Sequence, residues 1–257
     1  MRKLILICLP VAALLVAAAV ALGAVSTTFQ VIVSPAKAST KKKVRPISLA
    51  VNLSTADPAL AQPPPLKKVV IRLNKGGIFN GKLFPKCTSA KLLAKGVKGC
   101  PKGSKIGTGT AKASAKPIID LVNAKMTIFN GPTQGGKSTV LLYNVPDISS
   151  PIVVSGTVEK KPAVSCANGA GQCDYVLTFD VPDIPTLPNA PPASVLEVKT
   201  KSGGSGVFIR KKKHGKKVKI PYIGAPRTCT GKWVADLSIN FGDGQTATNT
   251  STASCKK

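Results

Sequence analysis

Residues 121–158 read LVNAKMTIFNGPTQGGKSTVLLYNVPDISSPIVVSGTV, and this stretch decides the fold class. It contains three short runs rich in β-branched residues, at 121–129, 139–143 and 152–158. Glycine, proline, aspartate and serine separate the runs. Short β-branched runs bounded by such residues are typical of strands. The stretch therefore predicts three successive strands joined by short turns.

The turn at residues 131–138 also satisfies the P-loop pattern G-x-x-x-x-G-K-[ST]. A P-loop cradles phosphate at the start of a helix, so the pattern needs a strand before it and a helix after it. The residues that follow, 139–146, are β-branched and end in Pro146. We therefore interpret residues 131–138 as a glycine-rich hairpin turn, and the sequence predicts no cofactor.

The rest of the chain repeats this pattern. Further strand candidates lie at residues 47–54, 69–73, 106–113, 175–181, 195–198, 207–209, 218–222, 233–241 and 246–254. Turn-forming residues separate them at fairly even spacing, which is typical of an all-β sandwich or barrel. Only Ser89–Lys95 has a helical pattern. We predict an all-β, disulfide-stapled, Ig-like β-sandwich.

Composition divides the chain into three parts. Residues 1–25 form a signal peptide or signal anchor, and residues 26–65 form a basic, proline-rich tether with one possible strand. Residues 66–257 form the β-sandwich domain, which could comprise two packed sub-domains.

The N-terminus has the pattern of an export signal. Met1-Arg2-Lys3 precedes an apolar run at residues 4–25, which we expect to form a hydrophobic helix. The run nearly reaches the length of about 20 residues that spans a bilayer, so a cleaved peptide and an uncleaved anchor both remain open. Small residues suited to signal peptidase occur at 21–23, 24–26 and 36–38. For an uncleaved anchor, the basic residues that follow the run would favour a cytoplasmic domain, but the later cysteines argue against that topology. We therefore expect the domain outside the cytoplasm, secreted or at the cell surface, with membrane contact only if the run stays uncleaved.

Six cysteines follow this segment, and an even number in an exported chain indicates disulfides. Six cysteines allow 15 pairings. They fall into three local couples in the sequence, which favours Cys87–Cys100, Cys166–Cys173 and Cys229–Cys255. No Cys-x-x-Cys occurs and the one histidine is His214, so the sequence predicts no metal site.

The chain is strongly basic, with a formal net charge of +27. The densest cluster flanks His214-Gly215 and predicts a β-hairpin with a basic tip. We take this cluster as a candidate polyanion-binding site: Arg210, Lys211, Lys212, Lys213, Lys216, Lys217 and Lys219. The alternative is that a lysine-rich hairpin simply discourages edge-to-edge aggregation.

Catalytic motifs are scarce. A serine-hydrolase triad would need His214, which no neighbouring residue orients as a base. A glycosidase needs two carboxylates flanking a bond, and the few acids, such as Asp174 and Asp180, are scattered. The sequence therefore predicts no catalytic residues and leaves enzymatic activity uncertain.

Residues 66–255 resemble a repeated domain of large predicted exported surface proteins of bacteria. The matching elements are FPKCT at 84–88, CPKGSKIG at 100–107, PRTC at 226–229 and the last cysteine, Cys255. The resemblance implies an extracellular, Ig-like context without catalytic residues. This chain differs in holding one copy and in its lysine content.

These features predict an exported structural or adhesive surface module. Its basic face would bind anionic cell-envelope polymers or other polyanions without sequence specificity. The alternative is a secreted hydrolase that acts on polysaccharide.

Overall fold

The computed structural model describes residues 25–166, 171–184, 192–213 and 215–257. The expected signal helix lies outside these residues apart from Val25. No helix in the described ranges is long and apolar enough to cross a membrane.

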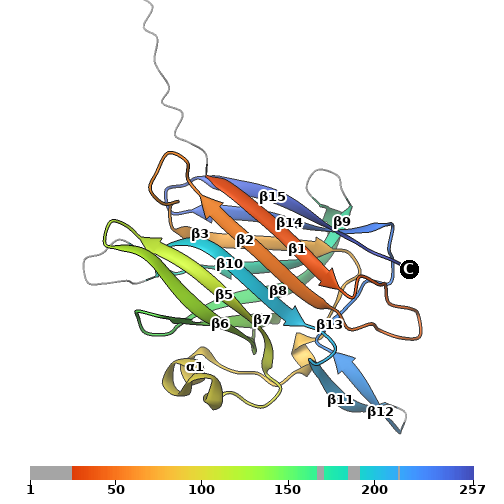
Figure 1. The fold of residues 1–257 in the computed structure, drawn as a ribbon. Helices are drawn as coiled ribbons and strands as arrows, with labels where there is room; N and C mark the ends of the chain where they lie inside the picture. Colours follow the sequence, from red (N-terminus) through yellow and green to blue (C-terminus); the bar gives the residue numbers. More distant parts are fainter. Residues whose placement is uncertain (1–24, 167–170, 185–191, 214) are drawn as a thin grey trace, which may run out of the picture.

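Eleven strands form one sheet, so the all-β prediction is confirmed (Figure 1). Every ladder within this sheet is antiparallel. In spatial order the strands are β1 (Ser26–Ser34), β2 (Ser48–Ala56), β10 (Ser194–Gly203), β5 (Lys105–Ala115), β6 (Ile119–Gln134), β7 (Lys137–Pro146), β8 (Ile152–Ser165), β9 (Gln172–Asp180), β3 (Leu66–Asn74), β14 (Lys232–Phe241) and β15 (Thr246–Ser254).

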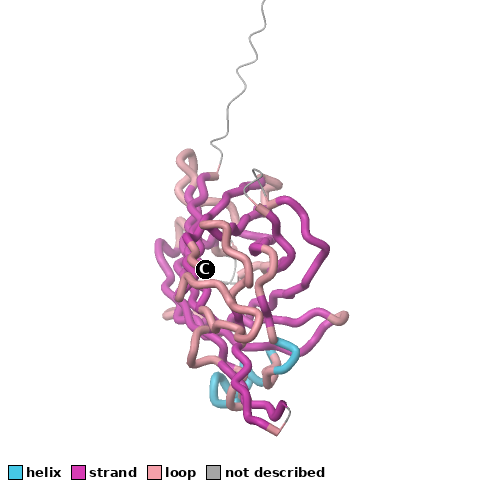
Figure 2. The backbone as a smooth tube through the Cα atoms, turned by 90° about the vertical axis from the view of Figure 1, so that its right-hand side faces the viewer, coloured by secondary structure: helices cyan, strands magenta, loops and turns pink. Residues whose placement is uncertain are grey.

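The sheet curls until its two edge strands, β1 and β15, lie beside each other (Figures 1 and 2). Eleven strands that alternate in direction leave the first and last strands pointing the same way. A parallel bridge between Lys37 and Lys256, just beyond the two strands, shows this shared direction. An antiparallel ladder therefore cannot join the two edges, and the sheet is nearly closed.

Side-chain hydrogen bonds join the two edge strands β1 and β15, whose contact we call the seam. The Val31 N–H donates to Ser251 Oγ at 2.8 Å, and Asn249 Nδ2 donates to the Thr27 carbonyl at 2.9 Å. Strand β15 is rich in Ser, Thr and Asn, whose short polar side chains can bond to a neighbouring backbone. The seam thus satisfies edge groups that would otherwise be open for pairing with another chain.

The Ig-like sandwich is not confirmed, because the eleven strands belong to one continuous sheet. Strands distant in sequence make the critical joins: β10 lies between β2 and β5, and β3 lies between β9 and β14. The alternation of apolar and polar residues identifies strands but does not specify their partners.

Residues 26–65 contribute two strands, where the sequence predicted a tether with one possible strand. Strand β1 buries Phe29 and Val31, and Val33 packs beside them. Strand β1 directly follows the apolar run of the expected signal, so its own alternation of apolar and polar residues is hard to distinguish in the sequence. Cleavage at residues 36–38 would remove β1, whereas cleavage at 21–23 would retain it.

Small elements cover one end and one outer face of the sheet. Strand β4 (Ile78–Phe79) pairs with β13 (Ile223–Gly224), and β11 (Phe208–Lys213) pairs with β12 (Lys216–Pro221) in a hairpin that projects beyond the sheet in Figure 1. Helix α1 (Ser89–Lys95) lies where the sequence predicted it, between the short 3-10 turns Gly81–Leu83 and Gly96–Gly99.

Helix α1 packs on the outer face of β6 and β7. The Thr88 side chain accepts a hydrogen bond from the Lys91 N–H and caps the helix. Leu92 is fully buried against Phe129 and Leu141. The outer face of β7 is thus covered by the helix, while its inner face lines the interior that the curled sheet encloses.

The three predicted disulfides are confirmed: Cys87–Cys100, Cys166–Cys173 and Cys229–Cys255. The first closes the segment that contains α1, the second joins the end of β8 to β9, and the third ties the segment before β14 to the end of β15. Such cross-links stabilise a domain chiefly by restricting its unfolded chain, typically by about 2–4 kcal/mol each.

Two glycines allow β5 to approach β10 closely. A Cβ atom at Gly107 or Gly109 would press against the carbonyl oxygens of Lys201 and Lys199, respectively. Glycine within a strand commonly marks such a close backbone approach or a bend. The glycine-rich part of β5 therefore suits a tightly curled sheet.

Candidate ligand cavity and basic hairpin

The interior of the sheet contains a cavity of about 290 Å³. Successive residues of a strand point to opposite faces, so every second residue of each strand faces inward. These inward residues are mainly Val, Leu, Ile and Ala, and the described lining contains no Asp or Glu. An inner surface of this kind favours apolar molecules.

The cavity follows from strand number and side-chain size. A closed sheet of about eight strands is just wide enough to be filled by side chains or to hold one small ligand, and wider ones enclose space. Here eleven strands surround the interior. Several lining positions carry only alanine, among them Ala111, Ala113 and Ala124. The side chains therefore leave the centre unfilled.

Aromatic rings close one end of the cavity. Tyr222 makes edge contacts with Phe79 and Phe84, with ring centroids 4.8 and 4.9 Å away. Tyr222 is 1% exposed, and this burial raises the pKa of its phenol. Its hydroxyl donates to Asn130 Oδ1 at 3.1 Å, so the buried phenol has a partner.

Asn130, on β6, completes a fully bonded network at this end. Its Nδ2 lies 3.0–3.2 Å from the carbonyl oxygens of Gly81, Phe84 and Pro85. With the Tyr222 hydroxyl on Oδ1, both polar atoms of the side chain are satisfied. Asn130 therefore fixes the segment before α1 to the sheet.

Asn144, on β7, differs from Asn130. It is 6% exposed and belongs to the cavity lining, together with Val140 and Leu142 of the same strand. Its Nδ2 donates to the Leu142 carbonyl at 3.1 Å, and its Oδ1 has no hydrogen-bond partner among the described residues. Its neighbours across the ladders are Met126 and Ile152, which are both apolar lining residues. The cavity thus contains a buried acceptor without a donor.

The lining continues to the surface near Asn144. Ile148 and Ser149, in the turn between β7 and β8, line the same cavity and are exposed. The end of the cavity beside Asn144 therefore reaches the described surface, whereas Tyr222 and its aromatic neighbours close the other end.

The predicted basic hairpin forms. Strands β11 and β12 place Arg210 opposite Lys219, Lys212 opposite Lys217, and the backbones of Lys213 and Lys216 opposite each other. Lys211 lies opposite Val218, and His214 is outside the described residues. The structure therefore brings the seven predicted cationic residues together on one hairpin.

Among the described residues, no carboxylate pairs with the cations of this hairpin. None of the six cationic side chains described on it forms an ion pair with a described acid, whereas lysines elsewhere pair with Asp183, Glu159 and Glu197. The Phe208 ring instead lies under two of the cations, 5.2 Å from the Arg210 guanidinium and 4.6 Å from the Lys219 ammonium. The hairpin thus presents unneutralised positive charge to solvent.

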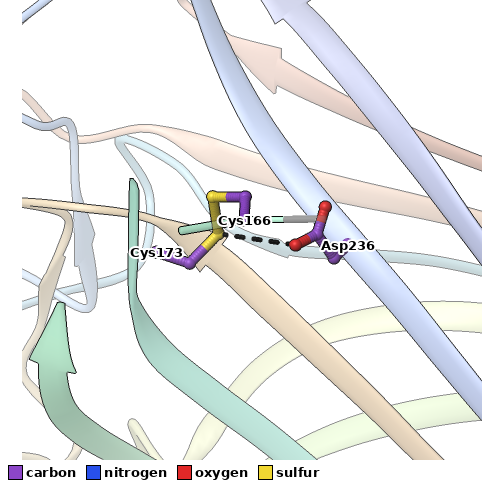
Figure 3. Close-up of side chains that lie close together, drawn as sticks. All are labelled: Cys166, Cys173 and Asp236. Carbon is purple, nitrogen blue, oxygen red and sulfur yellow. Dashed lines mark hydrogen bonds between the residues drawn. A yellow bond between two sulfur atoms is a disulfide. The ribbon is translucent and has the colours of Figure 1, made fainter. Parts of the chain in front are cut away.

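One group of three potential metal ligands occurs among the described residues, at Cys166, Cys173 and Asp236 (Figure 3). The two sulfurs are joined in a disulfide, and Cys173 Sγ lies 4.0 Å from Asp236 Oδ2. A disulfide offers no thiolate to a metal ion. The group is therefore a poor metal site while the disulfide is intact.

The acids considered for hydrolysis lie in separate surroundings. Asp174 accepts from the Gly76 N–H and lies 3.8 Å from Lys160, whereas Asp180 is exposed near Lys68. The Lys137 side chain, which bonds to Glu159, lowers the pKa of that carboxyl, so it stays ionised. None of these acids borders the described apolar cavity.

Two other acids share one surface feature. Asp120 and Asp243 line a shallow depression beside the proline-rich residues 63–65. Asp243 accepts hydrogen bonds from Gln245, and Asp120 lies 3.9 Å from Lys116. Each carboxylate is thus engaged by a near neighbour in sequence.

Sequence reasoning missed the cavity. The apolar inward positions are visible as alternation in the strands, but alternation does not show whether facing side chains meet or leave a space. Asn144 offered a weak signal, because it is an amide close after the apolar run Val140–Leu142 of the same strand.

No protein-family model, curated protein or solved structure matches this chain.

Proposed function

We propose that this protein acts outside the cytoplasm as a binder of an apolar small molecule, held inside the nearly closed sheet. The observation that supports this most strongly is the cavity of about 290 Å³ with an almost wholly apolar lining. An apolar cavity of about 150 Å³ stays dry and can bind benzene, so this volume suits a ligand about twice as large. A ligand gains about 0.8 kcal/mol for each CH₂ removed from water, before the cost of association is subtracted.

Location is part of this proposal. Three disulfides suggest an extracytoplasmic protein, since such bonds persist in oxidising compartments. We propose secretion or cell-surface retention through residues 1–25. Intact-mass measurement of the exported protein distinguishes a cleaved signal from a retained anchor.

Trp233 provides a built-in reporter for ligand binding. It is the sole tryptophan of the chain, is 5% exposed and lines the cavity. Titration with a bromoalkane of about ten carbons should quench its fluorescence in a saturable manner, because bromine quenches indole at short range. An absence of saturable quenching would overturn the proposal.

A cavity-filling variant with a matched control tests where the ligand binds. Ala111 faces the cavity and Thr110, its neighbour on β5, is exposed. Ala111→Phe should abolish the quenching by occupying the ligand's space, and Thr110→Phe should preserve it. Equal quenching in the two variants would place the bromoalkane outside the sheet.

A second proposed function concerns the basic hairpin. We propose that β11–β12 binds anionic cell-envelope polymer or another polyanion, without a cofactor. The supporting observation is the run of cross-strand cation pairs that lacks acidic partners in the described part of the chain. Such binding would be electrostatic and would weaken with salt.

The test is elution from a heparin column in a salt gradient. One variant replaces Lys211, Lys212, Lys213, Lys216 and Lys217 with Gln. Its control, with the same change of charge, replaces the exposed Lys41, Lys42, Lys43, Lys256 and Lys257 with Gln. A hairpin site predicts earlier elution of the first variant than of the control, and co-elution would show that only total charge matters.

As part of this second proposal, the protein would act as an adhesive surface module. The resemblance to repeat domains of exported bacterial surface proteins is in line with that role. A secreted polysaccharide hydrolase receives less support, since the acids considered for it lie in separate ion pairs and hydrogen bonds.

A further inference from the structure

We infer that the cavity ligand is a neutral apolar molecule bearing a hydroxyl group, and that Asn144 Oδ1 accepts the hydrogen bond of that hydroxyl. This inference rests on the proposed binding of an apolar ligand and specifies its chemical class. It begins from a buried acceptor that the surrounding residues leave unpaired.

The orientation of the Asn144 amide is set by its surroundings. Its Nδ2 donates to the Leu142 carbonyl at 3.1 Å, and exchanging the two amide atoms would bring two oxygens together. The neighbours across both ladders, Met126 and Ile152, offer no hydrogen-bond donor from their side chains. Oδ1 therefore remains available to a group within the cavity.

A ligand suits this acceptor better than a lone water molecule does. A buried water typically makes about three hydrogen bonds. Three lining hydroxyls have described bonds: Tyr222 donates to Asn130, Thr200 donates to the Val51 carbonyl, and Ser251 accepts from Val31. A water at Asn144 would thus have one clear partner, whereas a ligand hydroxyl would donate to Oδ1 while its chain contacts the apolar lining.

Charge determines the class of head group. The described lining has no acid that would attract an ammonium group. Its one basic residue, Lys112, is exposed and lies 3.4 Å from Glu197. A carboxylate placed at Asn144 Oδ1 would meet an acceptor, and burying its charge in this apolar cavity without a cation would be costly. A neutral hydroxyl fits, and the position of Asn144 near the surface end of the lining places that hydroxyl toward the opening.

Matched ligands provide the test. Decan-1-ol and decyl methyl ether have the same alkyl chain, but only the alcohol can donate a hydrogen bond. We expect the native protein to bind the alcohol about tenfold more tightly, as loss of one partner of a buried hydrogen bond commonly produces. Decanoate at neutral pH should bind more weakly than the alcohol. Trp233 fluorescence, with the bromoalkane displaced by each ligand, measures all three.

Variants assign the preference to one residue. Asn144→Leu should bind the ether and lose the preference for the alcohol, whereas Asn123→Leu, on the exposed face of β6, should keep it. Equal affinities for alcohol and ether in the native protein would overturn this inference and leave the proposed function intact. A preference that persists in Asn144→Leu would also overturn it. If neither ligand binds the native protein, the proposed function fails as well. The comparison of ligands on the native protein stands even if the Leu variant does not fold.

Discussion

Two buried asparagines on neighbouring strands serve different ends of the same sheet. Asn130 of β6 has every polar side-chain atom bonded, to three backbone carbonyls and the Tyr222 hydroxyl. Asn144 of β7 bonds only through Nδ2, and its Oδ1 faces apolar neighbours. A completed buried network holds structure in place, whereas an incomplete one lowers stability and leaves a group free to recognise a ligand.

The largest loss of stability is expected when the hydrogen-bond network around Asn130 is removed. Asn130→Leu would leave three carbonyl oxygens and the Tyr222 hydroxyl without this partner in a buried region. We expect the free energy of unfolding to fall by about 3 kcal/mol, because an unsatisfied buried polar group costs about 1–3 kcal/mol. Urea denaturation measures the loss. A loss below about 1 kcal/mol would contradict the structural role given to Asn130.

Removing only the hydroxyl of Tyr222 tests one bond of that network. Tyr222→Phe keeps the edge contacts with Phe79 and Phe84 but leaves Asn130 Oδ1 unpaired. We expect a loss of about 1–2 kcal/mol near pH 7, smaller than for Asn130→Leu. Urea denaturation of the two variants measures both losses of unfolding free energy. A larger loss for Tyr222→Phe than for Asn130→Leu would contradict the central role given to Asn130.

Alkaline pH sharpens the same test. Burial raises the pKa of Tyr222 in the folded state, so above about pH 10 the unfolded chain loses this proton first. The contribution of Tyr222 to stability is therefore complete below about pH 9 and declines as the pH rises through about 10 and above. The stability advantage of the native protein over Tyr222→Phe should shrink between pH 9 and pH 11. The two proteins differ only in this hydroxyl, so a constant difference in stability would contradict the burial of the phenol.

Substitution of Asn144, whose hydrogen bonding is incomplete, should not reduce stability as substitution of Asn130 does. Asn144→Leu removes an unpaired buried acceptor and adds apolar surface to an apolar lining. We expect the free energy of unfolding without ligand to stay within about 1 kcal/mol of the native value or to rise. Thermal melts of the ligand-free proteins measure this. A loss as large as that of Asn130→Leu would show that the Asn144 side chain is structural.

The smallest effect on stability is expected at the basic hairpin. Replacing Lys211, Lys212 and Lys217 with Gln removes exposed charges that have no described acidic partner. Surface changes of this kind usually alter stability by less than about 0.5 kcal/mol. A substantial loss in urea denaturation would indicate that the hairpin charges contribute to folding.

Much of the local structure could be predicted. Helix α1, the turn between β6 and β7 with positive φ at Gly135 and Gly136, and the three disulfides all follow from signals close together in sequence. The basic hairpin was predicted for the same reason, since its two strands flank a short turn. Strand β1 was not predicted although it alternates apolar and polar residues, because the apolar run at residues 4–25 leads directly into it.

From the amino-acid sequence we could predict that this chain forms strands and where its positive charge collects, because these properties depend on residues near one another in the chain. The sequence favoured one of the 15 possible cysteine pairings, and the structure established that pairing. Three features follow from the folded structure alone: β10 lies between β2 and β5, the sheet curls until β1 lies beside β15, and a cavity remains inside it. Those outcomes depend on which distant strands pair and on whether facing side chains fill the space between them. The unpaired Asn144 Oδ1 also follows from the folded structure alone, because the neighbouring strands supply no donor to it.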